Sequence, residues 1–263
     1  MPDNTKLVVT LEDRIKRITF NRPERRNALD FEMFEQLAAA IKESVKDESR
    51  VVVLAGAGDS FCSGLDLTSI DPAAIATLDV AKAVRELINP AIEGLRSLAK
   101  PVIARVHGSA VGIGFSYVLA SDFCVASEAS LFSQSFVRIG LMPDGGSTYF
   151  LPRLVGRARA FELMALGEQF DAREALRLGL INRVVPFEEL DRAVDQLAAR
   201  FVASPALSLA KIKAALYRAE ASDLAGALDF EAEGQQACFR TADFREGVTA
   251  FMQKRSAVFG KKS

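Results

Sequence analysis

Residues 102–122, VIARVHGSAVGIGFSYVLASD, join an apolar run to a glycine-rich turn and then to a helical pattern. The run VIARV is typical of a strand that is buried on both faces of a sheet. Gly108 to Gly114 allow a sharp turn and open a helix. The same order occurs earlier, where VVVLA (51–55) is followed by AGAGDSFCSG (55–64). This repetition predicts an α/β core.

Other elements are predicted by their hydrophobic periodicity. Asp30 can cap a helix whose apolar positions share one face, namely Phe34, Leu37, Ala38, Ile41 and Val45. A second helical pattern runs from Val84 to Leu98 and ends at Lys100-Pro101, and the chain is almost purely helical beyond Phe187. Further strands are expected at 7–11, 15–20, 123–126 and 183–185.

We therefore predict an α/β core over residues 1–200, which carries the active site, and a helical region over residues 201–263. The many apolar positions of this helical region need a surface to pack on, and another subunit would provide one.

Composition narrows the class of protein. A chain of 263 residues with 49% hydrophobic and 25% charged residues is typical of a globular protein with an ample core. The net charge of −1 gives no reason to expect nucleic acid or an anionic membrane as a partner. No apolar run approaches the length that crosses a bilayer.

The N-terminal sequence and the cysteines indicate a cytoplasmic protein. MPDNTKLVVTLEDR has no basic segment followed by an apolar stretch, so no secretory signal is expected. Cys62, Cys124 and Cys238 lie far apart and are interpreted as reduced thiols. With His107 as the only histidine, no metal site is expected.

The glycine-rich loops could bind an anionic oxygen. In FCSGLDL (61–67) and HGSAVGIGFSYVLASD (107–122), glycine leaves amide N–H groups unshielded near a helix start. Two such amides that converge form an oxyanion hole, which stabilises a thioester oxygen as it gains enolate charge. The spacing alone leaves open that both loops are merely turns. Gly-x-Gly at 112–114 lacks the third glycine of a dinucleotide fingerprint.

Five segments spread over the chain form a specific set of motifs. They are ITFNRPERRNAL (18–29), FCSGLDL (61–67), HGSAVGIGFSYVLASD (107–122), IGLMPDGGSTYFLPRLVGRARA (139–160) and FREGVTAFMQKR (244–255). Through them the chain resembles the enoyl-CoA hydratase/isomerase (crotonase) superfamily from end to end. This resemblance implies a crotonase-type α/β spiral of ββα units with a C-terminal α-helical trimerisation region, and trimers that often pair into hexamers. It also implies a coenzyme A thioester as substrate, with no separate cofactor and no metal.

The resemblance places the oxyanion-hole amides on Leu65 and Ile113. Glycine is usual at the second position, but any residue except proline offers a backbone N–H, so the role survives. The bulkier side chain of Ile113 is expected to narrow the pocket.

The resemblance also places contacts to coenzyme A. They fall on the backbone near Ala28, Ser63 and Leu65, and on a basic residue of the last helix, which matches Lys254. Arg25 is a candidate for the phosphates. For Arg25 and Lys254, solvated surface charge is the alternative interpretation.

Both glutamates that hydratases of this family use are missing. Their positions hold Ser116 and Phe136. A serine hydroxyl does not titrate near neutrality, and phenylalanine has no proton to give. Because general acid–base groups contribute about 10²–10⁴ each in rate, efficient hydration of the standard kind is not expected.

Asp144 is the only acid in residues 132–148, FSQSFVRIGLMPDGGST. One interpretation is an N-cap of a helix that begins near Gly145. The other is a catalytic base, because a branch of the family, including the ring-opening isomerases of phenylacetyl-CoA breakdown, keeps an aspartate there. The segments GLMPDGGSTYFLPRLVGRARA (140–160) and FREGVTAFMQKRS (244–256) resemble this isomerase type most. An apolar pocket would have to raise the pKa of Asp144 from about 3.9, and Phe136, Ile113 and Leu141 could form one.

Three hypotheses follow. The first is an enoyl-CoA isomerase that uses Asp144 for a 1,3-proton transfer, with the enolate held by the amides of Leu65 and Ile113. The second is an unusual hydratase in which Asp144 activates water. The third is a protein that binds CoA thioesters without turnover. The sequence does not indicate the acyl group, whose pocket wall is expected in the segment 68–95.

Overall fold

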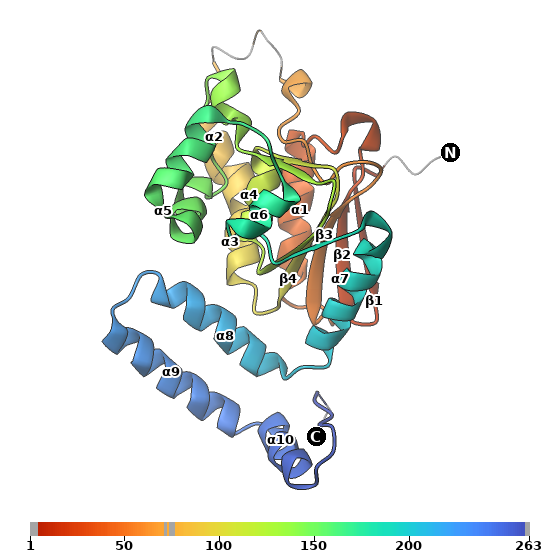
Figure 1. The fold of residues 1–263 in the computed structure, drawn as a ribbon, viewed down its shortest axis with the longest axis vertical. Coiled ribbons are helices and arrows are strands. Elements are labelled where there is room, and N and C mark those ends of the chain that lie inside the picture. The colour runs from red at the N-terminus through yellow and green to blue at the C-terminus, as the bar shows by residue number, and fades with distance from the viewer. Residues whose placement is uncertain (1–4, 71–72, 74–76, 261–263) are drawn as a thin grey trace.

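A computed structural model describes residues 5–70, 73 and 77–260. A six-stranded sheet lies at its centre (Figure 1). The first two strands form an antiparallel hairpin, and all other neighbours in this sheet are parallel. The strands predicted from the sequence are confirmed. In spatial order they are β1 (Leu7–Glu12), β2 (Ile15–Phe20), β3 (Val51–Gly56), β4 (Val102–Val106), β6 (Phe123–Ser127) and β9 (Arg183–Val185).

Helices cover both faces of this sheet. In β3, Val51 and Val53 pack with Val194 of α7 (Phe187–Val202). The alternate residues Val52 and Leu54 belong to the main core, to which α1 (Phe31–Glu43) and α3 (Asn89–Ser97) contribute. Because side chains alternate along a strand, one apolar run supplies both faces, as VVVLA predicts.

A second, three-stranded sheet lies where the sequence suggested loops. It pairs β5 (Ser109–Val111) with β7 (Leu131–Ser133), and β7 with β8 (Phe170–Asp171). Strands of two or three residues are too short for a readable alternation. As a consequence α4 (Ile113–Ala120) begins only at Ile113, after β5, and not directly at Gly108.

The predicted helices are present, with differences at their ends. Asp30 caps α1 through a bond from the Met33 amide to its side chain, at 3.0 Å. Val45 was expected on the apolar face, but it lies beyond the end of α1 and is exposed. The pattern from Val84 to Leu98 is continuous helix with a π-helical turn ahead of Pro90, which lacks an N–H. It consists of η3 (Val84–Ile88) and α3, and α2 (Val80–Ala83) directly precedes it.

The described part of the chain before α7 contains five further short or medium-length helices. They are η1 (Pro23–Arg25), η2 (Leu67–Ser69), η4 (Ser135–Ile139), α5 (Ser147–Leu166) and α6 (Ala172–Arg177).

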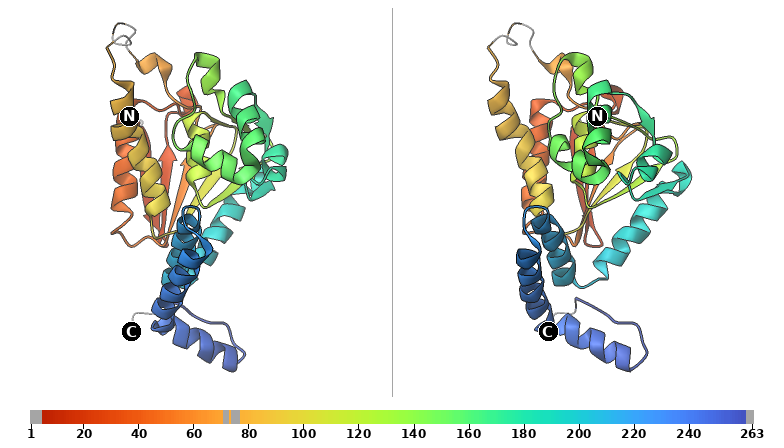
Figure 2. Two further views of the ribbon diagram at one scale, coloured as in Figure 1. Left: turned by 90° about the vertical axis from the view of Figure 1, so that its left-hand side faces the viewer. Right: turned by 60° about the vertical axis from the view of Figure 1, so that its left-hand side comes forward.

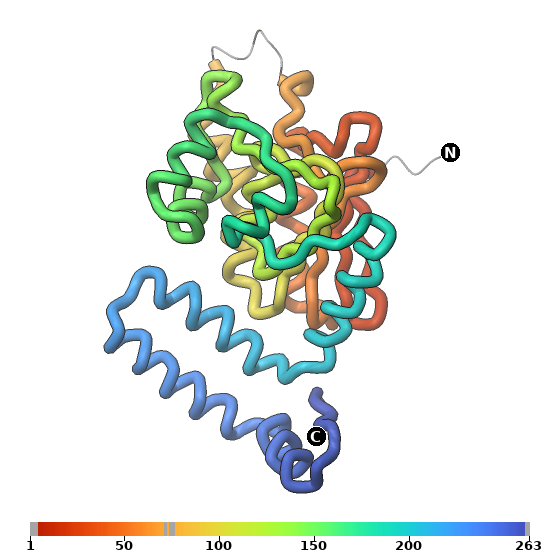
Figure 3. Tube along the Cα trace, in the orientation of Figure 1, coloured from red at the N-terminus to blue at the C-terminus, as the bar shows by residue number. Residues whose placement is uncertain are grey.

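The C-terminal helices form an arm that extends from one end of the core (Figures 1 and 2). α8 (Ala206–Ala219) lies against the core, α9 (Leu224–Phe239) runs back beside it, and α10 (Ala242–Met252) continues away (Figure 3). The α/β core with a helical C-terminal region is thereby confirmed. Large apolar side chains remain exposed on the arm, among them Leu216, Leu224, Leu228, Phe239, Phe251 and Met252.

A buried ion pair holds α8 to the core. The ammonium of Lys213 is 2.7 Å from Asp122 Oδ2 and also donates to the Leu95 carbonyl at 2.8 Å. Asp122 accepts further bonds from the Val102 amide and the Tyr217 hydroxyl. Because Lys213 is only 8% exposed, its positive charge is poorly hydrated, and the Asp122 carboxylate compensates for the lost hydration.

Replacing Asp122 with alanine should therefore destabilise the protein strongly. We expect Asp122→Ala to lower the free energy of unfolding by about 3–5 kcal/mol, because the Lys213 charge stays buried without its partner. Urea denaturation measures this change. The matched control is Glu35→Ala on the exposed surface of α1, for which we expect about 0.5 kcal/mol or less. Equal effects of the two substitutions would contradict the anchoring role.

Candidate active site

A cavity of about 230 Å³ lies between the two glycine-rich loops and the turn that precedes α5. Leu65, Ile113 and Asp144, which the sequence analysis expected to meet, all line it. Phe136 and Leu141 line it too, which provides the apolar surrounding expected for Asp144. The structure therefore brings the predicted catalytic residues together around one space.

A larger cavity, of about 490 Å³, lies beside α8. Its charged groups are engaged with one another in the Lys213–Asp122 pair and in a bond between Arg96 and Glu220 at 3.1 Å. The smaller cavity is thus the better candidate for chemistry.

The backbone N–H of Leu65 faces away from its pairing partner. Leu29 and Leu65 form a parallel bridge, in which the Leu29 amide donates to Gly64 and the Asp66 amide donates to Leu29. This pattern uses the neighbours of Leu65 and not its own amide. The N–H of Leu65 is therefore available at the cavity wall.

The amide of Ile113 is available for a different reason. Ile113 is the first residue of α4, so its N–H has no intrahelical acceptor and lies at the positive end of the helix dipole. Gly112 turns the chain into the helix with φ +56° and ψ −126°, a conformation that side chains oppose. Two amides suited to an oxyanion hole thus border the cavity.

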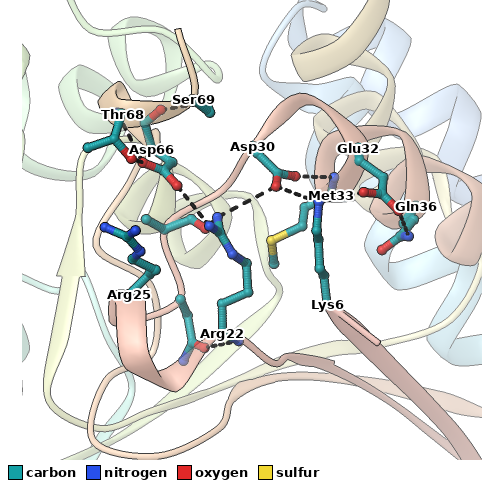
Figure 4. Close-up of polar contacts among 12 residues, drawn as sticks. Lys6, Arg22, Arg25, Asp30, Glu32, Met33, Gln36, Asp66, Thr68 and Ser69 are labelled. Carbon is teal, nitrogen blue, oxygen red and sulfur yellow. Dashed lines mark hydrogen bonds and ion pairs between the residues drawn. The ribbon is translucent and has the colours of Figure 1, made fainter. Parts of the chain in front are cut away.

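An ion pair holds the Leu65 loop in place (Figure 4). Arg22 donates to Asp66 Oδ2 at 2.9 Å and to the Ala28 carbonyl at 2.8 Å. Asp66 also accepts from the amide and hydroxyl of Thr68. Burial acts to raise the pKa of Asp66, but the bonds from Thr68 and Arg22 outweigh it and hold the pKa below its ordinary value. Asp66 therefore fixes the loop that carries Leu65.

Arg22 was missed by the sequence analysis. The segment NRPERRNAL contains three arginines, and nothing in their spacing tells which one faces inward. Arg22 is the arginine that bridges the Ala28 and Asp66 segments. Its Nη1 also lies 3.6 Å from Asp30 Oδ2. Arg25 lies beside this cluster in Figure 4 and joins none of the marked contacts.

The residues expected at coenzyme A are only partly brought together. The Ser63 amide donates to the Arg26 carbonyl at 3.0 Å, and its hydroxyl to the Arg25 carbonyl at 3.3 Å. Arg25, Ala28, Ser63 and Leu65 are therefore neighbours. Lys254 was expected in the last helix, but α10 ends at Met252, and Lys254 follows it on the arm.

Asp144 does not cap a helix. α5 begins at Ser147 with Gly146 as its N-cap, and no side chain caps it. Gly145 and Gly146 both have positive φ, at 58° and 79°, and add a turn that separates Asp144 from the first helical amides. The N-cap interpretation is therefore wrong.

The Asp144 carboxyl group lies in an environment that favours its protonated form. Its Oδ1 is buried, with no hydrogen-bond partner in the described part of the chain. Burial raises the pKa of Asp144 from an ordinary 3.8 to about 6. A carboxyl group with such a pKa can both accept and return a proton near neutral pH.

The two positions that hold glutamate in hydratases carry no acid here. The Phe136 ring lines the cavity, whereas Ser116 is fully buried and bonds to the Asp144 carbonyl at 3.1 Å. Among the described lining residues, Asp144 is the only carboxylate and Arg138 the only cation.

Other expected features lie away from the cavity. Both ring nitrogens of His107 are engaged within the fold: Nε2 lies 2.6 Å from the Gly58 carbonyl oxygen, and Nδ1 lies 2.8 Å from Arg105 Nη1. Over residues 5–70, 73 and 77–260, no cluster of His, Cys, Asp and Glu suits a metal ion. In the same residues, no helix is both long and apolar enough to cross a membrane.

The wall of the acyl pocket was expected in the segment 68–95. Part of this segment lies outside the described residues, but Ile88 of the segment lines the cavity.

Comparisons with known proteins agree with this arrangement. The family model described as enoyl-CoA hydratase/isomerase matches residues 10–262. The chain is 40% identical to 1,2-epoxyphenylacetyl-CoA isomerase of Escherichia coli K12 over 255 residues, which cover 96% of this chain and 97% of the relative. It is 33% identical to crotonyl-CoA hydratase of Syntrophomonas wolfei over 259 residues, with 97% and 98% covered.

A solved structure shows the same fold. The crystal structure of enoyl-CoA hydratase from Bacillus anthracis superposes with a TM-score of 0.90 at 30% identity, and covers 97% of this chain and 99% of that one. The crotonase-type fold and the similarity to a phenylacetyl-CoA-pathway isomerase, both expected from the sequence motifs, are confirmed. The chain belongs to the enoyl-CoA hydratase/isomerase family.

Proposed function

We propose that this protein is an acyl-CoA isomerase that moves a carbon–carbon double bond along a CoA thioester. The observation that carries the proposal is Asp144, the single carboxylate among the described residues that line the cavity, with its raised pKa. A 1,3-proton shift needs one base, which takes a proton from one carbon and returns it to another. Hydration by the usual route of the family needs two acids, and the described lining residues provide one.

Each step has a residue available for it. The thioester oxygen would accept bonds from the amides of Leu65 and Ile113. As Asp144 removes a proton beside the carbonyl, charge builds on that oxygen, and the two amides with the α4 dipole stabilise it. The protonated Asp144 then delivers its proton to the far carbon of the dienolate. Phe136 and Leu141 keep this exchange in an apolar surrounding.

The remainder of the substrate would lie outside the cavity along the Arg25–Ala28 and Ser63 segments, with Arg25 at the phosphates. Lys254 of the same chain sits on the arm, so we infer that a neighbouring copy supplies it. The exposed apolar side chains of the arm support a homotrimer or a pair of trimers. We also infer a cytoplasmic protein with reduced thiols and no cofactor beyond the CoA of its substrate.

Hydration is the second candidate, because relatives with 33–40% identity carry both hydratase and isomerase names. In that case Asp144 would activate water at the far carbon of a 2-enoyl-CoA. The apolar Phe136 at the cavity wall disfavours it, since it offers the water no partner. Binding of CoA thioesters without turnover is the third candidate.

Removing the Asp144 carboxylate should abolish double-bond migration. We incubate the protein with a 3-enoyl-CoA and, separately, with a 2-enoyl-CoA, and follow migration and water addition. Asp144→Asn is expected to lower the migration rate by at least about 10²–10⁴-fold while CoA-ester binding persists. If the variant isomerises as fast as the parent, Asp144 is not the base. Water addition without migration would favour the hydratase.

The pH profile should report the ionisation of Asp144. Because the base must be deprotonated and burial raises its pKa to about 6, kcat/KM should reach its upper level above that pH. At pH 5 we expect it to be about tenfold lower. A profile with its midpoint near pH 4 would show that the carboxylate is not held in an apolar surrounding.

The same burial should cost stability at neutral pH. The folded state binds the Asp144 proton more tightly than the unfolded chain, so its stability falls as pH rises from about 4 to 6. Asparagine cannot ionise. Asp144→Asn should therefore raise the free energy of unfolding by about 1–2 kcal/mol at pH 8, after discounting for partial exposure, and have no such effect at pH 4. Thermal unfolding of both proteins, with Glu35→Gln as the control, measures the difference. Equal stabilities at pH 8 would contradict the buried charge.

A further inference from the structure

We propose that Ser116, Ser147 and Gln134 form a hydrogen-bonded chain that positions Asp144 relative to the oxyanion amide of Ile113. This inference rests on the proposed role of Asp144 as the base. It gives a function to Ser116, which stands where hydratases of the family keep a glutamate.

The chain consists of three fully buried polar side chains. Gln134 Nε2 donates to Ser147 Oγ at 2.8 Å, and Ser147 Oγ lies 2.8 Å from Ser116 Oγ. Ser116 Oγ donates to the Asp144 carbonyl at 3.1 Å, closer than its other acceptor, the Gly112 carbonyl at 3.3 Å. Each hydroxyl has one proton, so the bonds can all point the same way, from Gln134 to Asp144.

The chain connects the elements that build the site. Ser116 lies three residues after Ile113, on the helix α4 that begins at the oxyanion amide. Ser147 is the first residue of α5, and its amide also donates to the Asp144 carbonyl, at 3.2 Å. Gln134 precedes η4, which carries Phe136. The Asp144 backbone is therefore held by residues of both α4 and α5.

Packing brings the Asp144 turn directly onto α4. A Cβ on Gly145 would lie 2.3 Å from Ile113 Cδ1 and 2.8 Å from Ser116 Cβ, so only glycine allows this approach. Ile113, which replaces the usual glycine, is 2% exposed, and its side chain packs against the turn at Gly145.

The backbone has to do this positioning because the carboxylate has little else to hold it. Asp144 Oδ1 has no hydrogen-bond partner among the described residues, and the one bond that acts on the pKa of the carboxylate comes from its own backbone amide. A partner on the carboxylate would lower its pKa and weaken it as a proton acceptor and donor near neutrality. Anchoring the carbonyl of the same residue orients the side chain and leaves the pKa raised.

The test measures kinetics in Ser116→Ala, Ser147→Ala and the double variant. We expect kcat for isomerisation to fall about 10–100-fold in each single variant, with KM within about twofold, because binding surfaces are unchanged while the base is misplaced. The double variant should lose no more than the worse single variant, since one chain is broken in each. The control is Ser133→Ala, a buried serine whose hydroxyl bonds to the Gly167 carbonyl at 3.0 Å, outside the chain.

A kcat loss in Ser116→Ala no larger than in Ser133→Ala would overturn the inference. Multiplicative losses in the double variant would overturn it as well. If Ser116→Ala does not fold, Ser147→Ala and Gln134→Leu break the same chain at other links.

A second measurement does not depend on turnover. Carboxyl ¹³C resonances are titrated, and Asp144 is assigned by its absence in Asp144→Asn. In the parent we expect a pKa of about 6, and in Ser116→Ala a decrease toward the ordinary 3.8, because the released turn admits water. An unchanged pKa in Ser116→Ala would contradict the positioning role. If the parent shows no Asp144-dependent turnover, the proposed isomerase function fails, and this titration alone decides the positioning inference.

Discussion

The parallel pairing of β3 with β4 brings the site together. Parallel strands that are neighbours in a sheet end at the same edge, so the loops that follow them must meet there. The loop after β3 ends at Leu65, and the chain after β4 passes through β5 to Ile113. Two backbone amides from segments almost fifty residues apart in sequence thus border one cavity. The proposed stabilisation of a thioester oxygen depends on this convergence.

Polar contacts outside the cavity then fix the position of each part of the site. The Arg22–Asp66 ion pair fixes the Leu65 loop, and the bonds from Ser116 and Ser147 hold the Asp144 backbone. In both cases the anchoring groups contact a neighbouring carbonyl or carboxylate. They leave the Leu65 amide and Asp144 Oδ1 without a partner among the described residues. The Asp144 carboxylate stays poorly solvated as a result, which raises its pKa and reduces the stability of the fold at neutral pH.

The sequence predicted the strands of the main sheet and most of the helices, because runs such as VVVLA and the face of α1 repeat with a clear period. The second sheet was not predictable, since β5, β7 and β8 have two or three residues each. Motifs led to Asp144, Leu65 and Ile113, but not to Arg22 or to the role of Ser116. Those roles depend on which side chain faces which backbone, and neighbouring arginines or serines look alike in sequence. The N-cap interpretation of Asp144 failed because two glycines of positive φ add a turn before α5.

The central claim is that one sheltered carboxylate carries a proton between two carbons of the acyl chain. The most direct measurement uses a 3-enoyl-CoA labelled with deuterium at carbon 2, converted in ordinary water under single-turnover conditions. If Asp144 is the base, part of the deuterium will be found at carbon 4 of the 2-enoyl product, and Asp144→Asn will not transfer it. The claim would be contradicted if the deuterium that leaves carbon 2 were lost entirely to solvent in the parent protein. Equal transfer by the variant would contradict it as well.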